Sequence, residues 1–169
     1  GRSAKVPSQT GIALDAAGNI FVGASGNNTI RKGTPTGVVT TFAGLAGVGG
    51  SADGIGSAAR FNGPRGVAAD AAGNIYVADT FNNTVRKITP AQVVSTFAGL
   101  AGADGSIDGV GNVARFNRPR GVAVDGVGNI FVADTANSTV RRITPGQSVT
   151  TVAGVPGVSG SDDGSVFGS

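Results

Sequence analysis

The sequence of 169 residues contains no cysteine and no histidine, and all ten of its acidic residues are aspartate. Without cysteine the chain forms no disulfide and offers no thiol nucleophile. Without histidine it lacks the Ser-His-Asp arrangement and the usual ligand sets of zinc and copper. We therefore expect no catalytic residue, no metal site and no cofactor, and we interpret the protein as a non-enzyme.

Long apolar runs and strong charge are also missing. No apolar stretch approaches the roughly 18–20 residues that cross a bilayer. The formal charge is +3, and no run of basic residues is longer than two. A basic balance this slight is weak support for a polyanionic partner. We expect a soluble protein with no membrane partner, in a bacterial secreted or periplasmic location.

The residues that are abundant favour an all-β fold. The chain has 30 glycines and seven prolines together with many Val, Thr and Ala residues, which is typical of short strands joined by tight turns. Glutamate is absent and only three lysines occur, so the long, straight side chains favoured in helices are scarce apart from arginine.

The sequence repeats itself at a constant step. Residues 66–80 return at 121–135, and a weaker copy lies at 11–22. Between 56–110 and 111–165, 35 of 55 positions are identical, without a gap. A period of this size predicts an array of similar structural units, each too small to bury its hydrophobic face alone.

One unit predicts four antiparallel strands, at 64–70, 74–79, 84–88 and 93–98 in the middle copy. Four strands of about five or six residues form one blade of a β-propeller. A Gly-rich connector over 99–117 leads to the next unit, and its ends repeat in all copies, so we expect it to be ordered. Asp53-Gly54, for example, recurs as Asp108-Gly109 and as Asp163-Gly164.

One pattern runs from Phe61 to Ile88 and again from Phe116 to Ile143, namely F-N-x-P-R-G-V-A-x-D-x-x-G-N-I-[FY]-V-A-D-T-x-N-x-T-V-R-[KR]-I. This pattern resembles the NHL-repeat family. The resemblance implies a propeller, usually of six blades, that acts as a binding platform. Some members are enzymes and some bind RNA. We assign blade 1 to residues 1–55, blade 2 to 56–110 and blade 3 to 111–169, in a single repeat-built domain.

The first copy is divergent. It has Ala24 where Asp79 and Asp134 stand in the other copies, and Gly33 where they have isoleucine. Its Val6-Pro7-Ser8-Gln9 replaces the Phe-Asn-Gly-Pro of the second copy. Terminal repeats are often atypical because their outer face meets something different.

Three blades do not close a ring, since propellers have about four to eight blades. An open arc would expose two apolar blade faces. We therefore predict a homodimer of two three-bladed halves, because two-fold pairing is the commonest form of oligomer. Two alternatives are a fragment of a longer propeller and an open head-to-tail stack.

Candidate residues fall into two groups. We predict that Phe61 and Phe116 fill the gaps between neighbouring blades. The other residues predicted to be structural, at the blade interfaces or in the turns, are Arg60, Arg115, Asp70 and Asp125. We interpret Asp70 and Asp125 as caps of the Asp-x-x-Gly-Asn turns.

The second group is a candidate ligand face made of basic and Asn-rich loops. It consists of Arg65, Arg118, Arg120, Phe81, Asn82, Asn83 and Asn137. Such a face would contact a protein or a polyanion, and RNA is one alternative because arginine binds phosphate and an aromatic ring stacks on bases. A carboxylate site for Ca²⁺ at Asp15, Asp70 and Asp125 is a further alternative.

Overall fold

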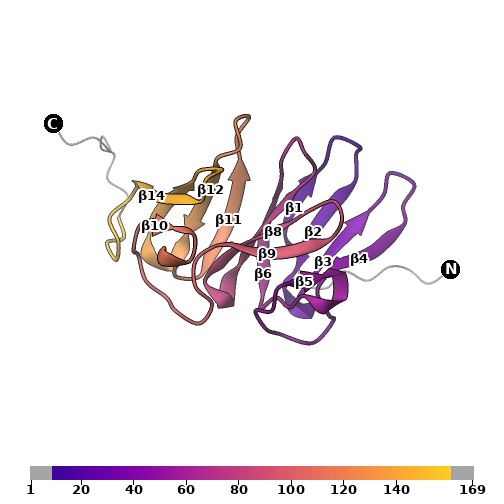
Figure 1. The fold of residues 1–169 in the computed structure, drawn as a ribbon, viewed down its shortest axis with the longest axis horizontal. Coiled ribbons are helices and arrows are strands. Elements are labelled where there is room, and N and C mark those ends of the chain that lie inside the picture. Colours follow the sequence, from indigo (N-terminus) through magenta and orange to yellow (C-terminus); the bar gives the residue numbers. More distant parts are fainter. Residues whose placement is uncertain (1–8, 161–169) are drawn as a thin grey trace.

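A computed structural model describes residues 9–160 of the chain. Its strands form three antiparallel sheets that stand side by side in chain order (Figure 1). Each sheet is one blade, and the strand order within blade 1 follows the sequence. The strands of blade 1 are β1 (Gln9–Leu14), β2 (Ile20–Ala24), β3 (Thr29–Gly33) and β4 (Val39–Ala43).

Blades 2 and 3 repeat this arrangement and confirm the four predicted strands of each unit. Those of blade 2 are β6 (Pro64–Ala69), β7 (Ile75–Asp79), β8 (Thr84–Ile88) and β9 (Val93–Ala98). Those of blade 3 are β11 (Pro119–Val124), β12 (Ile130–Asp134), β13 (Thr139–Ile143) and β14 (Ser148–Ala153). The first strand of each blade lies innermost, and these three strands adjoin one another.

The connectors are ordered, as predicted, and they add a strand that the sequence pattern did not indicate. β5 (Gly54–Ile55) pairs with the outer strand β9 of blade 2, and β10 (Gly109–Val110) pairs with β14 of blade 3. Blades 2 and 3 therefore have five strands. β5 belongs to the first sequence unit and yet joins the sheet of blade 2, so the sequence units and the sheets are offset.

Short 3-10 helices complete the fold. Three of them join the second and third strands of a blade: η1 (Ser25–Asn27), η3 (Thr80–Asn82) and η5 (Thr135–Asn137). Two follow the short connector strands: η2 (Gly56–Ala58) and η4 (Gly111–Val113). No helix in the described part of the chain is long and apolar enough to span a membrane.

The hydrophobic core lies between the blades. We call the face that a blade turns to the next blade its leading face, and the opposite one its trailing face. At the first junction the leading face of blade 1 contributes Phe21, Ile30, Phe42 and Ala43. The trailing face of blade 2 and its connector contribute Ala59, Phe61, Val67, Ile75, Val77, Ile88 and Val94.

The second junction uses the same repeat positions. Tyr76, Val85, Phe97 and Ala98 of blade 2 meet a cluster of blade 3 residues that includes Phe116, Ile130 and Val132. Phe61 and Phe116 are completely buried in the two clusters, in the gaps between blades where they are predicted to lie. The two junctions are thus built by residues that correspond to one another in the repeat.

The inner strands approach one another so closely that glycine is required. A Cβ atom on Gly66 would overlap the Arg120 carbonyl oxygen of blade 3, and one on Gly11 would overlap the Arg65 carbonyl oxygen of blade 2. The equivalent glycine of blade 3, Gly121, would place its Cβ at 3.4 Å from the Ala133 side chain, an ordinary contact. The difference follows from the position of blade 3 at the end of the array.

Candidate functional site

The most elaborate polar site of the chain surrounds a buried arginine in the third strand of blades 2 and 3. The guanidinium of Arg86 is completely buried. Its Nη1 lies 3.0 Å from Asp79 Oδ2, and its Nη2 lies 2.6 Å from Asp53 Oδ1. Asp79 comes from the neighbouring strand β7, whereas Asp53 comes from the connector just before β5. The ion pairs therefore tie the connector to the blade.

Backbone carbonyls of the connector also accept hydrogen bonds from this guanidinium, whose buried Nε has no partner among the described residues. Arg86 donates to the carbonyl oxygens of Arg60 and Ala52 at 3.0 and 3.1 Å. The ring of Phe61 lies below it, with 5.3 Å between the guanidinium carbon and the ring centroid. A buried charge is tolerated when it is paired and hydrogen-bonded in this way.

The carboxylate of Asp79 accepts hydrogen bonds on both of its oxygens. It accepts the Asn62 backbone N–H at 2.7 Å on Oδ1 and the Asn82 side-chain amide at 2.7 Å on Oδ2. Burial raises the pKa of Asp79 to about 6, although the hydrogen bonds from Asn62 and Asn82 and the charge of Arg86 act in the opposite direction. Asp79 thus orders the loop between the second and third strands.

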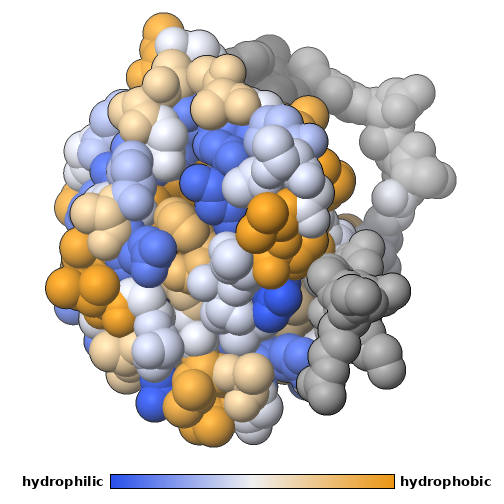
Figure 2. Space-filling view, turned by 90° about the vertical axis from the view of Figure 1, so that its right-hand side faces the viewer, coloured by the Kyte–Doolittle hydropathy of each residue, from blue (hydrophilic) through white to orange (hydrophobic). Residues whose placement is uncertain are grey.

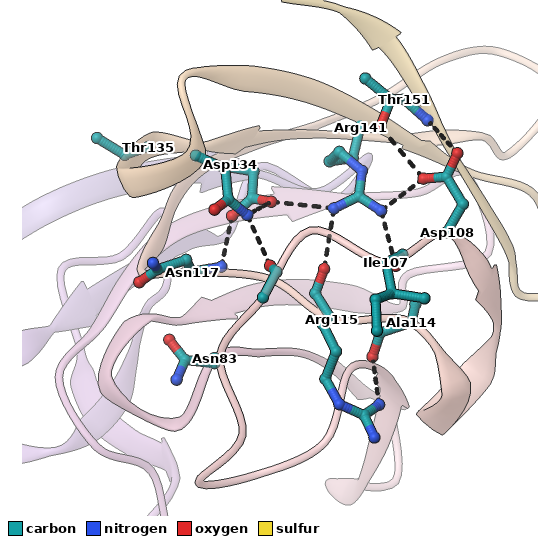
Figure 3. Close-up of polar contacts among 12 residues, drawn as sticks. Asn83, Ile107, Asp108, Ala114, Arg115, Asn117, Asp134, Thr135, Arg141 and Thr151 are labelled. Atoms are coloured by element: carbon teal, nitrogen blue, oxygen red, sulfur yellow. Dashed lines mark hydrogen bonds and ion pairs between the residues drawn. The ribbon is translucent and has the colours of Figure 1, made fainter. Parts of the chain in front are cut away.

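Blade 3 holds the same network (Figure 3). Arg141 lies between Asp134, at 3.0 Å, and Asp108, at 2.6 Å. It also donates to the carbonyl oxygens of Arg115 and Ile107. Burial raises the pKa of Asp134 as well. The recurrence of every partner at the step of the sequence repeat identifies the network as part of the scaffold.

Sequence reasoning did not find this network. Alternation along the strand 84–88 exposes only one residue of the Arg86-Lys87 pair to solvent, and it does not show what the other one contacts. The partner Asp53 lies far from Arg86 along the chain, so no local pattern joins them. The only available signal was the recurrence of Asp-Gly in the connector, at the same step as the strand arginine.

The arginines of the predicted structural group have a more local role than an interface between blades. Arg60 Nη1 donates to the carbonyl oxygens of Ser57, Ala58 and Ala59 at 2.7, 3.1 and 2.8 Å. Arg115 repeats this arrangement in the next connector. Both side chains fix the 3-10 turn that precedes them.

Asp70 and Asp125 cap the turns between the first two strands of their blades. Asp70 accepts the backbone N–H and the side-chain amide of Asn74, both at 2.8 Å. Asp125 accepts the same pair from Asn129. The hydrogen bond from the Asn129 side chain is the main reason why the pKa of Asp125 lies below its ordinary value. These two carboxylates therefore hold the turns together, each within a single blade.

Two members of the predicted ligand face are buried and belong to the network instead. Asn82 and Asn137 donate to Asp79 and Asp134, and each also donates to a connector carbonyl. Both side chains are thus engaged by buried carboxylates, and their part in a ligand face stays a prediction. Asn83 supplies its side-chain oxygen to the Arg118 backbone N–H at 2.9 Å, which links blade 2 to the blade 3 connector.

The remaining members lie around two hollows. A hollow of about 460 Å³ between the loops of blades 2 and 3 is lined by Phe81, Asn83, Asp104, Asn117, Arg118 and Ala136. A second, of about 420 Å³, lies where the inner strands meet. It is lined by Thr10, Gly11, Ile12 and their counterparts Arg65, Gly66, Val67, Arg120, Gly121 and Val122.

The chemistry available to these sites is limited. Within residues 9–160 no group of three or more acidic side chains is arranged to hold a metal ion. Asp15, Asp70 and Asp125 each accept hydrogen bonds within their own turns. The arginines and the exposed Phe81 can contact a ligand, and the blade faces can contact another blade.

Three antiparallel blades around shared inner strands define a propeller-type fold. The family model described as NHL repeat matches residues 61–88 and 116–143. Protein SUPPRESSOR OF QUENCHING 1, chloroplastic, from Arabidopsis thaliana is 38% identical over 95 residues, which cover 56% of this chain and 9% of that protein. NHL repeat-containing protein 2 from Bos taurus is 34% identical over 95 residues, covering 54% and 13%. The chain thus carries two matches to the NHL repeat, and it spans only a small part of the length of these curated relatives.

Solved structures agree on the fold. An auxiliary nutrient binding protein from Bacteroides thetaiotaomicron has a TM-score of 0.68 and 25% identity, over 83% of this chain and 36% of that one. A chain of a nidogen/laminin complex has a TM-score of 0.64 and 16% identity, over 88% and 49%. The chain spans less than half the length of either structure.

Proposed function

We propose that this chain is a non-enzymatic binding and assembly scaffold, in which two copies join to close a six-bladed ring. One observation carries the proposal: the two blade faces that the chain leaves open are the two halves of the junction that it already uses twice. The absence of histidine and cysteine and the scaffold role of the buried carboxylates support the non-enzymatic part.

The open trailing face belongs to blade 1. Ile12 and Leu14 are 67% and 65% exposed, whereas Val67, the counterpart of Ile12 in blade 2, is 5% exposed. Ile20 is 37% exposed, although its counterparts Ile75 and Ile130 are completely buried. Seen from the blade 1 end, the surface carries several hydrophobic patches among hydrophilic residues (Figure 2).

The open leading face belongs to blade 3. Its residues are the counterparts of the Phe21 and Ile30 group, namely Phe131, Val140, Val152 and Ala153. Val140 is 38% exposed, whereas its counterparts Ile30 and Val85 are completely buried. This face fits the trailing face of a second blade 1, because the same positions pack together at both internal junctions.

Two-fold symmetry makes both new junctions equivalent. Blade 3 of each copy meets blade 1 of the other, so the pairing leaves no face open and gives six blades, within the usual range of about four to eight. The hollow at the inner strands then becomes part of a central channel, and the loop hollow lies on one face of the ring. Both are candidate positions for a protein or small polar ligand. The names of two similar structures, a nutrient binding protein and a nidogen/laminin complex, support a binding role.

The test is the mass of the protein in solution. Sedimentation or light scattering should give twice the 16.4 kDa of one chain. V140D should convert the dimer to a monomer, because a carboxylate would be buried at the junction. V127D is the matched control, since Val127 is a turn residue that is 77% exposed and lies on neither blade face. A wild-type monomer, or a V127D variant that dissociates as readily as V140D, would overturn the proposal.

Polyanion binding stays a prediction. The Arg65 guanidinium lies 5.9 Å from the ring centroid of Phe81, which is 51% exposed. Arg118 and Arg120 are exposed too. Arg118 lines the same hollow as Phe81, and Arg120 lines the same hollow as Arg65. Retention on immobilised RNA that weakens with salt and is lost in R118A/R120A would support this function. Retention that is indifferent to those substitutions would contradict it.

A further inference from the structure

Residues that depart from the repeat gather around the hollow of about 460 Å³ between the loops of blades 2 and 3, which we call the loop hollow. Three of its lining residues are unlike their counterparts one repeat step away. These counterparts are Gly26 and Ala136 for Phe81, Gly49 and Ser159 for Asp104, and Ser8 and Gly63 for Arg118. Scaffold positions recur in a repeat protein, whereas variable loop positions carry binding. The loop hollow is therefore the place where this chain departs from its own scaffold.

Two of these departures fit one another sterically. A Cβ atom on Gly63 would overlap the Phe81 ring, so the ring excludes a side chain at that position of blade 2. In blade 3, Ala136 stands in place of the ring and Arg118 stands in place of the glycine. The loop of blade 2 thus gives the loop hollow an aromatic ring that is 51% exposed, and the connector to blade 3 gives it a guanidinium.

Arg118 has a backbone conformation that favours glycine. Its φ is +51°, and its counterpart Gly63 has a φ of +61°. The Asn83 side-chain oxygen accepts the Arg118 N–H at 2.9 Å and holds the arginine in this conformation. A bulky residue in the left-handed region costs free energy, and such residues cluster at active sites and ligand-binding positions.

The two charges of the loop hollow are not paired with each other. Every ion pair among residues 9–160 belongs to the buried arginine networks. Asp104 and Arg118 are exposed and line the same hollow without forming one. Asn83 and Asn117 lie on one side of the blade 3 network (Figure 3) and add amide groups to the lining. Each of the two charges is thus open to a ligand group of the opposite sign.

Hydrogen bonds of the scaffold fix the frame of this hollow. The carbonyl of Gly105, the residue after Asp104, accepts the buried Asn137 side-chain amide at 2.7 Å. On the other side, the Asn117 carbonyl accepts the Ala136 N–H at 3.0 Å. A frame that is ordered before a ligand arrives lowers the entropic cost of binding.

We propose that the loop hollow binds a small zwitterion with an apolar group, a free α-amino acid or a short peptide. Arg118 binds the carboxylate, Asp104 binds the ammonium group, and the Phe81 ring packs against the apolar group. A polyanion would meet the charge of Asp104 and a polycation that of Arg118, so a ligand that carries both charges fits the hollow better. The proposal rests on the binding part of the proposed function and does not require the ring to close.

The first experiment compares ligands by isothermal titration calorimetry on the full chain. L-phenylalanine and the dipeptide phenylalanylglycine are the two probes, and the tighter one identifies the source of the zwitterion. Phenylpropionate lacks the ammonium group and phenethylamine lacks the carboxylate, so each should bind about tenfold more weakly than L-phenylalanine. Binding of either analogue as tightly as L-phenylalanine, or no binding of both zwitterions at millimolar concentration, would overturn the proposal.

The second experiment assigns the two charges. R118Q should weaken the binding of L-phenylalanine about tenfold and leave that of phenethylamine unchanged, because the amine has no carboxylate to lose. D104N should likewise weaken L-phenylalanine and leave phenylpropionate unchanged. K87Q is the matched control, because Lys87 lies near the end of β8 that is remote from the loop. Equal losses in R118Q and K87Q, or weaker phenethylamine binding by R118Q, would contradict these roles.

The mass of the protein in solution separates this proposal from the ring. If the chain is a dimer that binds neither zwitterion, the ring stands and only this inference fails. If the chain is a monomer whose binding of L-phenylalanine is weakened by R118Q and D104N, the ring is wrong and the site stands.

Discussion

Blade 1 and blade 2 share a backbone plan and differ in how they are held. In blade 2 a connector strand covers the outer edge, and two aspartates enclose a buried arginine. In blade 1 the strands, turns and leading face are the same in kind, but Ala24 replaces one aspartate and the described chain supplies neither the second nor the edge strand. The comparison teaches that a blade of this chain is completed by the segment that precedes it.

The largest effect is expected where the buried pair is broken. D79A leaves the completely buried Arg86 without its nearest strand carboxylate, which should destabilise the chain by about 3–5 kcal/mol. Urea denaturation followed by circular dichroism measures the loss. D104A is the control, because it removes an exposed connector carboxylate and should change stability by less than about 0.5 kcal/mol. A D79A variant as stable as the wild type would show that the pair does not hold blade 2.

A glycine comparison separates a closed junction from an open one. G66A forces a Cβ against the Arg120 carbonyl and should cost about 1–3 kcal/mol of chain stability. G121A has room in the single chain, so the urea midpoint of the dilute, monomeric chain should be unchanged. In the proposed ring, however, Gly121 faces blade 1 of the second copy, and G121A should weaken the dimer. Equal destabilisation of the monomer by both variants would refute this reading of the inner strands.

The pH dependence of stability should distinguish the blade with the network from one without it. Because the folded pKa of Asp79 is raised to about 6, the folded state binds this proton more tightly than the unfolded chain does. The contribution of Asp79 to the free energy of unfolding is therefore fully present below the pKa that this residue has in the unfolded chain. It is lost as pH rises through about 6, at no more than about 1.4 kcal/mol per pH unit. D79N should make the stability profile flatter between pH 4 and 6, as measured by urea midpoints. D15N in blade 1 is the control, because the pKa of Asp15 is lowered rather than raised, and it should leave the fall between pH 4 and 6 in place.

The smallest effect is expected where the blades do not differ. Asn19 and Asn74 make the same hydrogen bonds to the aspartate of their turns. N19A and N74A should each cost about 0.5–1.5 kcal/mol, and the two losses in thermal or urea denaturation should agree. A much larger loss in one blade would mean that the turns are not equivalent after all.

The sequence predicted the parts of the fold that local periodicity determines. The alternation and the Asp-x-x-Gly-Asn turns place the strands of blade 2 to within a residue, and the positions of Phe61 and Phe116 between blades follow from their place at the end of an ordered connector. The short strands β5 and β10 were missed, because strands this short carry no periodic signal. The burial of Asn82 was missed because the local pattern does not show that Asp79, the last residue of the predicted strand 74–79, is buried and needs a donor. The pairing of Asp53 with Arg86 depends on a crossing between blades.

That crossing has a consequence for how such chains change in length. Each connector belongs by sequence to one blade and by contact to the next, so the repeat period has no privileged starting point. A duplication or deletion of one whole repeat period, wherever in the period it begins, would leave the same residues on both sides of every junction between blades. The number of blades can therefore vary without any new kind of interface between blades.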